Sequence, residues 1–174
     1  MGQHNILCAY FSLRGETYVN GHIEIREKGN TEVVVERLAE LKEMDRFYIK
    51  KVDAYPFTYK ETVEIAKAEW KADARPEITD KVDHMEQYDT VILGYPNRCH
   101  TMPKAVFTFL EAYDFSGKKI VPFCTNEGSG LGASVEDIKK LCPSSIVTAG
   151  TSIHGAEAAT VTEELKQILA QVEE

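Results

Sequence analysis

DTVILGYP, residues 89–96, carries the clearest structural signal in this chain. Its apolar residues follow one another without polar alternation, are rich in β-branched side chains and end in Gly-Tyr-Pro. Such a run is typical of a strand that is buried on both faces, as in a parallel sheet. Runs of similar character predict four more strands, over residues 5–12, 47–52, 118–125 and 144–150.

The stretches between these runs show the periodicity of helices. Apolar residues recur at helical spacing, and Thr160-x-x-Glu163 matches a capping box. Strands that alternate with helices predict an α/β fold, with one domain over residues 1–174 and helices on both faces of a five-stranded parallel sheet. The strand order 2-1-3-4-5 is one of the two common orders for such a sheet. The predicted helices span residues 31–43, 58–73, 103–113, 134–141 and 160–172.

The composition limits the classes of function. The chain has 174 residues, 43% of them hydrophobic, and a formal net charge of −8. The hydrophobic fraction is large enough for a buried core. The negative net charge argues against a nucleic-acid surface, which needs clustered Lys and Arg, and favours docking onto a basic partner. The four cysteines show neither metal-site nor redox spacing, and neither a signal peptide nor a membrane span is visible. We expect a cytoplasmic protein without metal, nucleic-acid or membrane partners, as a monomer or weak dimer.

Ligands of open α/β sheets bind outside the carboxyl ends of the strands, where the strand order reverses. The loops after predicted strands 1, 3 and 4 should therefore form the site. In the first loop, Asn20-Gly21 lies between two short extended stretches and predicts an inserted β-hairpin. Ser12, Asn30 and Thr31 could cradle a phosphate at the helix N-terminus, or Asn30 and Thr31 could only cap that helix.

The loops after strands 3 and 4 supply the other two walls of the predicted site. The first of them runs from Gly94 to Pro103. The second contains Gly128, Gly130 and Gly132, which let the backbone approach a flat ligand with N–H groups pointing inward. Each loop alone is a weak signal, but their occurrence after neighbouring strands of one sheet is a stronger one.

At four places the sequence resembles the flavodoxin family, and the resemblance covers nearly the whole chain. It is similar to short-chain bacterial flavodoxin-like proteins that carry an insertion inside the phosphate loop. The resemblance implies a flavodoxin-like three-layer sandwich with one non-covalently bound FMN. The motifs are AYFS (9–12) with GNTEVV (29–34), Ala74-Arg75-Pro76-Glu77-Ile78, ILGYP (92–96) with TMPKAVFTFLEAYDFSGKKIVPFCT (101–125), and GSGLGAS (128–134).

The resemblance also implies where FMN would bind. Its phosphate would lie in the loop after strand 1, against Ser12, Asn30 and Thr31, and Arg14 would pair with the phosphate or point into solvent. Its isoalloxazine ring would lie between the loops after strands 3 and 4. The residues of those loops that match the family are Pro96, Asn97, Arg98, Cys99, Thr125, Asn126, Glu127, Gly128, Ser129 and Gly130.

Two features depart from the family pattern. Related proteins usually carry an aromatic residue where this chain has Arg98-Cys99, and the lost stacking would weaken ring binding by roughly 0.5–1.5 kcal/mol. The hairpin also splits the phosphate motif. We hypothesise that Arg98 lies near the ring and stabilises the anionic reduced flavin, which would raise the reduction potential. The alternative is an arginine that points into solvent.

The function that the resemblance implies is FMN-dependent electron transfer, in which no side chain acts as a catalyst. An FMN-dependent NAD(P)H:quinone-type reductase shares the fold and the cofactor and stays an alternative. So does a module that has lost FMN and binds a partner. The spacing Cys8-x5-Arg14 is similar to that of low-molecular-weight tyrosine phosphatases, although the residues between read as a strand rather than a phosphate loop.

Overall fold

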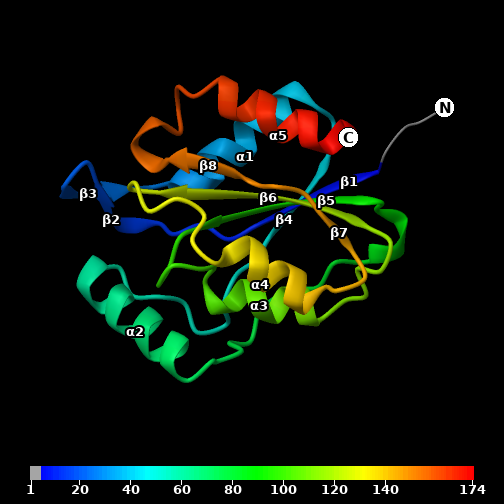
Figure 1. Ribbon diagram of the computed structural model, residues 1–174. Helices are drawn as coiled ribbons and strands as arrows, with labels where there is room; N and C mark the ends of the chain where they lie inside the picture. The colour runs from blue at the N-terminus through cyan, green and yellow to red at the C-terminus, as the bar shows by residue number, and fades with distance from the viewer. Residues whose placement is uncertain (1–4) are drawn as a thin grey trace.

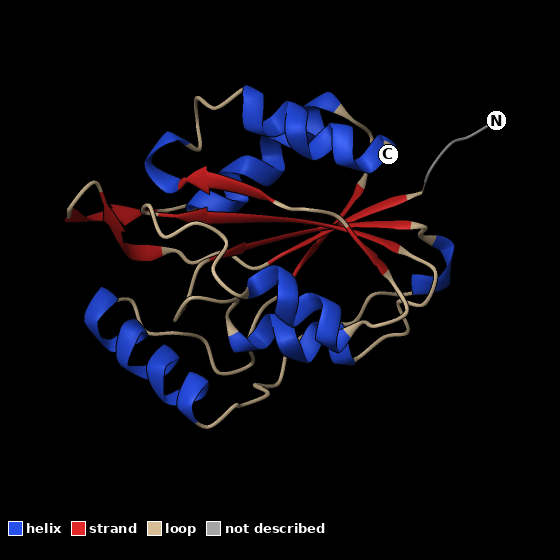
Figure 2. Ribbon diagram, viewed as in Figure 1, coloured by secondary structure: helices blue, strands red, loops and turns tan. Residues whose placement is uncertain are grey.

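The computed structural model describes residues 5–174. Its main sheet has the strand order β4-β1-β5-β6-β7, with β8 also paired to β6, and every strand pairing in it is parallel. The sheet is twisted and lies between two layers of helices (Figures 1 and 2). Its strands are β1 (Ile6–Tyr10), β4 (Asp45–Tyr48), β5 (Thr90–Pro96), β6 (Lys119–Asn126), β7 (Ile146–Val147) and β8 (Thr151–His154).

The predicted order 2-1-3-4-5 is confirmed, but the fifth strand is broken in two. β7 pairs with the start of β6, and β8, which was not predicted, pairs with its end. Between them Gly150 adopts a φ of +87°. The side-chain oxygen of Gln171, from the last helix, accepts the Gly150 N–H at 3.1 Å and the Thr148 hydroxyl at 2.6 Å. A side chain thus supplies hydrogen bonds where the strand is interrupted.

Helices cover both faces of the sheet (Figure 1). One layer holds α1 (Asn30–Leu41) and α5 (Glu163–Glu173), and the other holds α3 (Lys104–Glu111) and α4 (Ser134–Leu141). The remaining helix, α2 (Tyr59–Lys71), lies farther out on the α3–α4 side, and only two of its residues are buried. Within residues 5–174, no helix has both the length and the apolar character that crossing a membrane requires.

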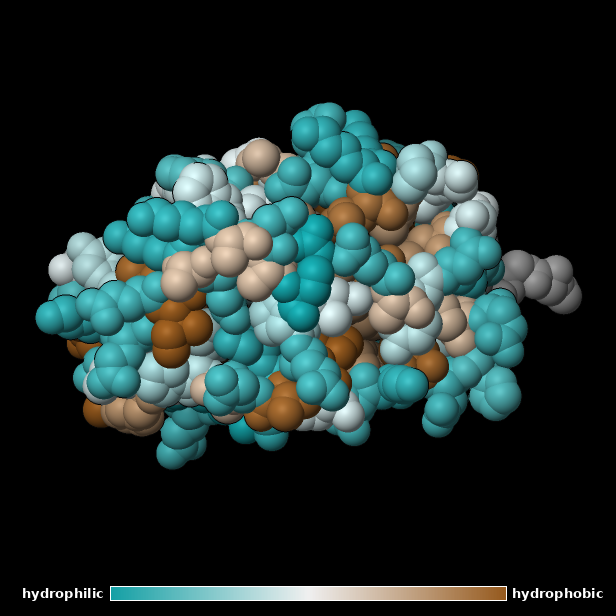
Figure 3. All heavy atoms as spheres, turned by 90° about the horizontal axis from the view of Figure 1, so that it is seen from below, coloured by the Kyte–Doolittle hydropathy of each residue, from teal (hydrophilic) through white to brown (hydrophobic). Residues whose placement is uncertain are grey.

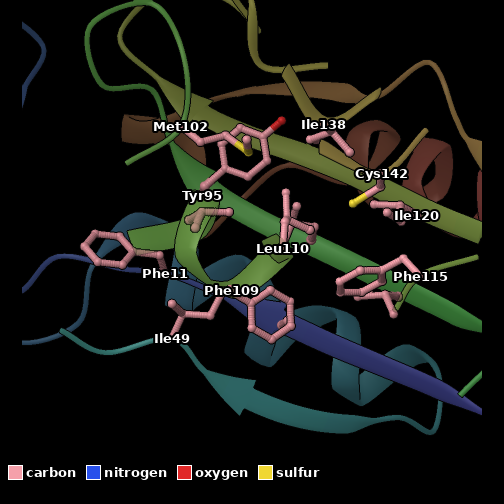
Figure 4. Packing of buried hydrophobic residues seen from close by; sticks show 14 of the residues in the cluster. Phe11, Ile49, Tyr95, Met102, Phe109, Leu110, Phe115, Ile120, Ile138 and Cys142 are labelled. Carbon is pink, nitrogen blue, oxygen red and sulfur yellow. The ribbon is translucent and has the colours of Figure 1, made fainter. Parts of the chain in front are cut away.

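Alternate side chains of the central strands face opposite layers. In β1, Leu7 and Ala9 pack into the core on the α3–α4 side, while Ile6 and Cys8 pack on the α1–α5 side. Figure 4 shows the first of these cores, in which side chains of α3 lie among side chains of the strands. Burial on both faces explains why the strand sequences lack polar alternation. The parallel pairing of the strands places their carboxyl ends at one rim.

The start of α5 differs from the prediction. Its N-cap is Thr162, with no side-chain cap hydrogen bond, and the helix begins at Glu163. Thr160 lies in the turn after a short 3-10 helix (Gly155–Glu157), and its hydroxyl donates to the Glu157 carbonyl oxygen at 3.2 Å. The predicted capping box is therefore wrong, because its threonine bonds backward and not into the helix.

The predicted hairpin is confirmed. β2 (Gly15–Val19) and β3 (His22–Arg26) form an antiparallel pair of their own, outside the main sheet. At the turn, Asn20 and Gly21 adopt φ values of +48° and +85°, as a tight two-residue hairpin requires. The hairpin projects at the end of the molecule where the central strands finish (left in Figure 1).

Candidate functional site

A pocket of about 220 Å³ opens at the rim where β1, β5 and β6 end. Its walls come from the loop after β1, the hairpin, the starts of α1 and α2, and the loops after β5 and β6. This is the switch point of the sheet, because β1 has β4 on one side and β5 on the other. The residues predicted from the sequence that line it are Ser12, Asn30, Thr31, Pro96, Asn97, Arg98, Thr125, Asn126, Glu127 and Ser129.

The start of α1 presents free backbone donors to this pocket. Gly29 is the N-cap, and no side-chain cap hydrogen bond is formed. Instead the Ser12 hydroxyl, from the loop after β1, accepts the backbone N–H of Glu32 at 3.1 Å. Within residues 5–174, the backbone N–H groups of Asn30 and Thr31 have no hydrogen-bond partner. The idea that these two residues only cap the helix is therefore wrong, and two N–H groups stay available for an anion.

The loop and the helix meet closely at this point. A Cβ atom on Gly29 would lie 2.2 Å from the Ser12 hydroxyl oxygen and 2.3 Å from the Leu13 carbonyl oxygen. No larger residue fits there without displacing the loop after β1. The absence of a side chain at Gly29 thus lets Ser12 reach the helix.

Two buried polar atoms in the pocket wall lack a partner. Asn30 Oδ1 and Thr17 Oγ1 make no hydrogen bond within the described part of the chain. Leaving a buried polar atom unpaired costs about 1–3 kcal/mol, so such atoms usually mark a binding site or a bound water. Both residues face the same pocket as the free N–H groups of α1. The arrangement suits a ligand that carries hydroxyl groups as well as an anion.

Arg98 brings an uncompensated positive charge to the wall. Among residues 5–174, no carboxylate pairs with its guanidinium, whose single hydrogen bond goes to the Asn97 carbonyl oxygen at 3.4 Å. Burial lowers the pKa of this guanidinium, and the nearby phenols of Tyr59 and Tyr55 oppose that shift. An arginine stays protonated even so. The pocket therefore contains a cation with which no carboxylate of the described residues forms a direct ion pair.

A strained turn holds Arg98 in place. Arg98 and Thr101 exchange backbone hydrogen bonds of 2.8 and 3.0 Å, and between them Cys99 and His100 adopt left-handed φ values of +52° and +65°. Non-glycine residues in this region cost roughly 1–2 kcal/mol each. The carbonyl oxygen of His100 accepts the Ala133 N–H at 2.7 Å, so the loop after β6 fixes the turn.

The loop after β6 uses its glycine amides internally. Asn126 Oδ1 accepts the N–H groups of Gly128 and Gly130 at 2.9 and 3.1 Å. Asn97 donates its side-chain amide to the Gly130 carbonyl oxygen at 3.0 Å, which ties the two loops together. Neither glycine lines the pocket. The expectation that these N–H groups point inward is wrong, because the side chain of Asn126, at the end of β6, already accepts both of them.

Arg14 and Cys99 also lie outside the pocket. Arg14 makes two hydrogen bonds to the Glu32 carboxylate, at 3.1 and 3.2 Å, and its guanidinium lies 5.5 Å from the centre of the Tyr48 ring. This ion pair directs the side chain away from the pocket, so the structure does not place Arg14 on a phosphate. Cys99 faces a separate small cavity that Tyr55 also lines.

Two aromatic residues line the pocket although the sequence did not indicate them. Tyr18 comes from the hairpin and Tyr59 from the first residue of α2, and their rings stack with centroids 5.8 Å apart and planes 28° apart. The hairpin and the helix were each predictable. Their contact was not, because it depends on how the long segment between β4 and α2 folds.

The alternative of a phosphatase is contradicted. Cys8 is fully buried in β1, and burial raises the pKa of its thiol to about 12, with a smaller opposing effect of Arg46. Such a thiol carries almost no thiolate at neutral pH and cannot act as a nucleophile. Arg14, the other half of the motif, pairs with Glu32 instead. Among the described residues, no group of three or more His, Cys, Asp or Glu side chains is placed to hold a metal ion.

Comparison with known proteins agrees with this architecture. The family model described as Flavodoxin matches residues 5–171. No curated protein sequence matches the chain. A candidate flavoprotein from Bacteroides eggerthii is 27% identical, with a TM-score of 0.76 over 98% of this chain and 97% of that chain.

Two further solved structures share the fold at lower identity. A flavoprotein from Lactobacillus acidophilus, solved in complex with FMN, is 18% identical, with a TM-score of 0.63 over 89% of this chain and 96% of that chain. Oxidised Flavodoxin 2 from Bacillus cereus is also 18% identical, with a TM-score of 0.52 over 97% of this chain and 98% of that chain. At such identities the likeness concerns the fold alone.

Proposed function

The chain belongs to the flavodoxin family, and from this premise we propose that it binds FMN in the rim pocket and passes electrons to and from redox partners. When bound, FMN supplies the electron-transfer chemistry, while the protein supplies binding, orientation and electrostatics. The Lactobacillus acidophilus relative, whose structure contains FMN, supports the choice of cofactor.

The observation that carries the proposal is the start of α1. Its unbonded N–H groups at Asn30 and Thr31 match the acceptor oxygens of a phosphate, and the positive end of the helix dipole favours the negative charge. A helix start in this state is incomplete unless an anion or water bonds it. The phosphate of FMN supplies the missing acceptors.

The unpaired side-chain atoms fit the next part of the ligand. Asn30 Oδ1 needs a donor, and Thr17 Oγ1 can donate or accept. The ribityl chain of FMN carries three hydroxyl groups that can meet both needs. A free inorganic phosphate offers fewer donors for Asn30 Oδ1 than a phosphorylated polyol does. The donor set therefore fits a phosphorylated polyol better than phosphate alone.

The size of the pocket bears on how the ring would lie. At about 220 Å³ it is smaller than the roughly 300–1,000 Å³ typical of cofactor sites. Part of a bound FMN would therefore lie outside the rim. Electron transfer to a second protein requires such an accessible part of the flavin.

Arg98 would tune the reduction potential. A fixed cation without a counter-ion favours the more negative state of any ligand beside it, which for a redox group raises the potential. Glu127 also lines the pocket, and its carboxylate acts in the opposite direction; it lies 2.8 Å from His154 and accepts the Asn20 N–H at 3.2 Å.

The net charge of −8 favours a basic redox partner, because complementary charge speeds encounter. A test reduces the FMN-loaded protein chemically and mixes it with cytochrome c, a basic electron acceptor. We expect rapid reduction of cytochrome c that slows as salt is added. A rate that does not depend on salt would contradict the charge argument.

Titration of the flavin-free protein with FMN tests the binding. We expect saturable quenching of flavin fluorescence, and weaker binding of riboflavin, which lacks the phosphate, by at least roughly tenfold. Absence of quenching at excess FMN would overturn the proposal. Steady-state oxidation of NADH or NADPH in the presence of a quinone, above the rate of free FMN, would instead identify a reductase.

A further inference from the structure

The pocket has an aromatic wall that comes from outside the three rim loops. Tyr18 of the hairpin and Tyr59 of α2 both line it, and their rings stack on each other. At the position in the loop after β5 where related proteins usually carry an aromatic residue, this chain has Arg98 and Cys99. The only aromatic rings among the described residues that line this pocket are those two tyrosines.

The wall is held in place at both ends. The Glu16 carboxylate accepts the backbone N–H of Tyr59 at 2.9 Å, and the Glu16 N–H donates to the Phe57 carbonyl oxygen at 3.0 Å. At the tip of the hairpin, the Asn20 N–H donates to the Glu127 carboxylate at 3.2 Å. Glu127 itself belongs to the loop after β6. The hairpin thus bridges the start of α2 and the far side of the pocket.

Both tyrosines keep surface free for another ring. Tyr18 is 41% exposed, and Tyr59 is partly exposed, although the two rings already contact each other. In Figure 3 brown patches interrupt the polar surface, several of them toward the end where the hairpin and α2 lie in Figure 1. The exposed large apolar residues of the hairpin, of α2 and of the segment between β4 and α2 are Tyr18, Ile23, Ile25, Val52, Phe57, Ile65 and Trp70.

We infer that Tyr18 and Tyr59 form the surface against which the flat ring of the bound flavin packs. The inference rests on the proposed function and extends it, because it assigns the inserted hairpin to ring binding. The lost aromatic at Arg98-Cys99 is thereby replaced from a different part of the chain. This role does not conflict with that of Arg98 in the same pocket. The tyrosines would contact the face of the ring, whereas the Arg98 cation would act on the charge of the ring.

The assignment separates ring binding from phosphate binding. The tyrosines belong to the hairpin and to α2, whereas the unbonded N–H groups belong to α1. Loss of the two tyrosine rings should therefore lower the affinities for riboflavin and for FMN by the same factor. A substitution that disrupts the start of α1 should lower the affinity for FMN more than the affinity for riboflavin.

The test compares the double variant Tyr18→Leu/Tyr59→Leu with the wild type by titration of FMN and of riboflavin. We expect both ligands to bind roughly tenfold more weakly, and the remaining complex to fluoresce more strongly because stacked tyrosine quenches flavin emission. Tyr18→Phe/Tyr59→Phe, which keeps the rings, should restore affinity. Trp70→Leu removes an aromatic ring of α2 that does not line the pocket and should leave both affinities unchanged.

Two results would overturn the inference while the proposed function stands. One is a leucine double variant with the affinity and fluorescence of the wild type. The other is a loss of binding that the phenylalanine variant does not restore, since that would show a structural role of the hydroxyl groups. A wild-type protein that binds neither flavin would overturn the proposed function itself.

Discussion

The hydroxyl oxygens of Thr31 and Thr125 lie 2.9 Å apart, although the two residues are 94 positions apart in the chain. The contact joins the start of α1 to the end of β6. Both threonines are buried, so water does not compete for this hydrogen bond. The floor of the pocket is therefore already formed in the protein without a ligand. Because the pocket is preformed, the effect of each side chain on ligand binding can be predicted one residue at a time.

Replacing Asn30 should weaken FMN binding without lowering the stability of the fold. Asn30→Leu removes a buried oxygen that has no partner, so the free energy of unfolding should stay the same or rise by up to about 1 kcal/mol. The same oxygen is assigned to the ribityl chain, so FMN affinity should fall roughly tenfold. Urea unfolding and fluorescence titration measure the two effects.

Thr58→Val is the matched control for that experiment. Thr58 Oγ1 is also buried without a partner within the described residues, but Thr58 does not line the pocket. Its replacement should leave FMN affinity unchanged. Equal affinities of Asn30→Leu and the wild type would show that the unpaired oxygen does not contact the ligand.

Removing the Arg98 charge should lower the reduction potential of the FMN-loaded protein. For Arg98→Gln we expect a fall on the order of 30 mV, which corresponds to about 1.4 kcal/mol for two electrons. Arg46→Gln, at an exposed arginine on β4, provides the control and should have little effect because salt screens it. Spectroelectrochemical titration measures both, and equal potentials for Arg98→Gln and the wild type would contradict the role.

Removing the Glu127 carboxylate, which accepts the Asn20 N–H, should make the tip of the hairpin more mobile without unfolding the protein. Glu127→Ala removes the acceptor of the Asn20 N–H and the partner of His154. The pair is partly exposed, so the free energy of unfolding should change by less than about 1 kcal/mol. Hydrogen exchange at the Asn20 amide should nevertheless accelerate. An unchanged exchange rate would mean that other contacts hold the hairpin tip.

The buried thiol of Cys8 should make the protein less stable in alkali. Burial raises its pKa from 9.0 to about 12, so between these values the folded state keeps a proton that the unfolded state has lost. The free energy of unfolding should therefore fall as pH rises above 9, by about 1.4 kcal/mol per pH unit from this thiol. Urea unfolding at pH 8 and pH 10 measures the slope, which Cys8→Ala should reduce. Identical slopes in both proteins would contradict this assignment.

Much of the fold follows from local patterns. The apolar run at 89–96 predicted β5, Asn20-Gly21 predicted the hairpin turn, and the run at 134–141 matches α4 as observed. Each of these features depends on residues close together in the chain. The broken fifth strand could not be found in this way, because Gln171, in α5, supplies hydrogen bonds at the break.

The same distinction between local patterns and long-range contacts applies to the candidate site. Turn residues and the rule for parallel sheets were enough to predict that Ser12, Asn30 and Thr125 lie at one rim, because their positions there follow from strand direction alone. Side-chain partners were not accessible in that way. The ion pair that turns Arg14 away and the contact of Tyr18 with Tyr59 join segments far apart in the chain. The hydrogen bond of Asn126 to the Gly128 N–H lies within one turn, but it depends on a side-chain orientation that the sequence pattern does not specify. Hydrogen bonds and ring contacts have short range, so only the packed chain settles which groups satisfy one another and which remain free for a ligand.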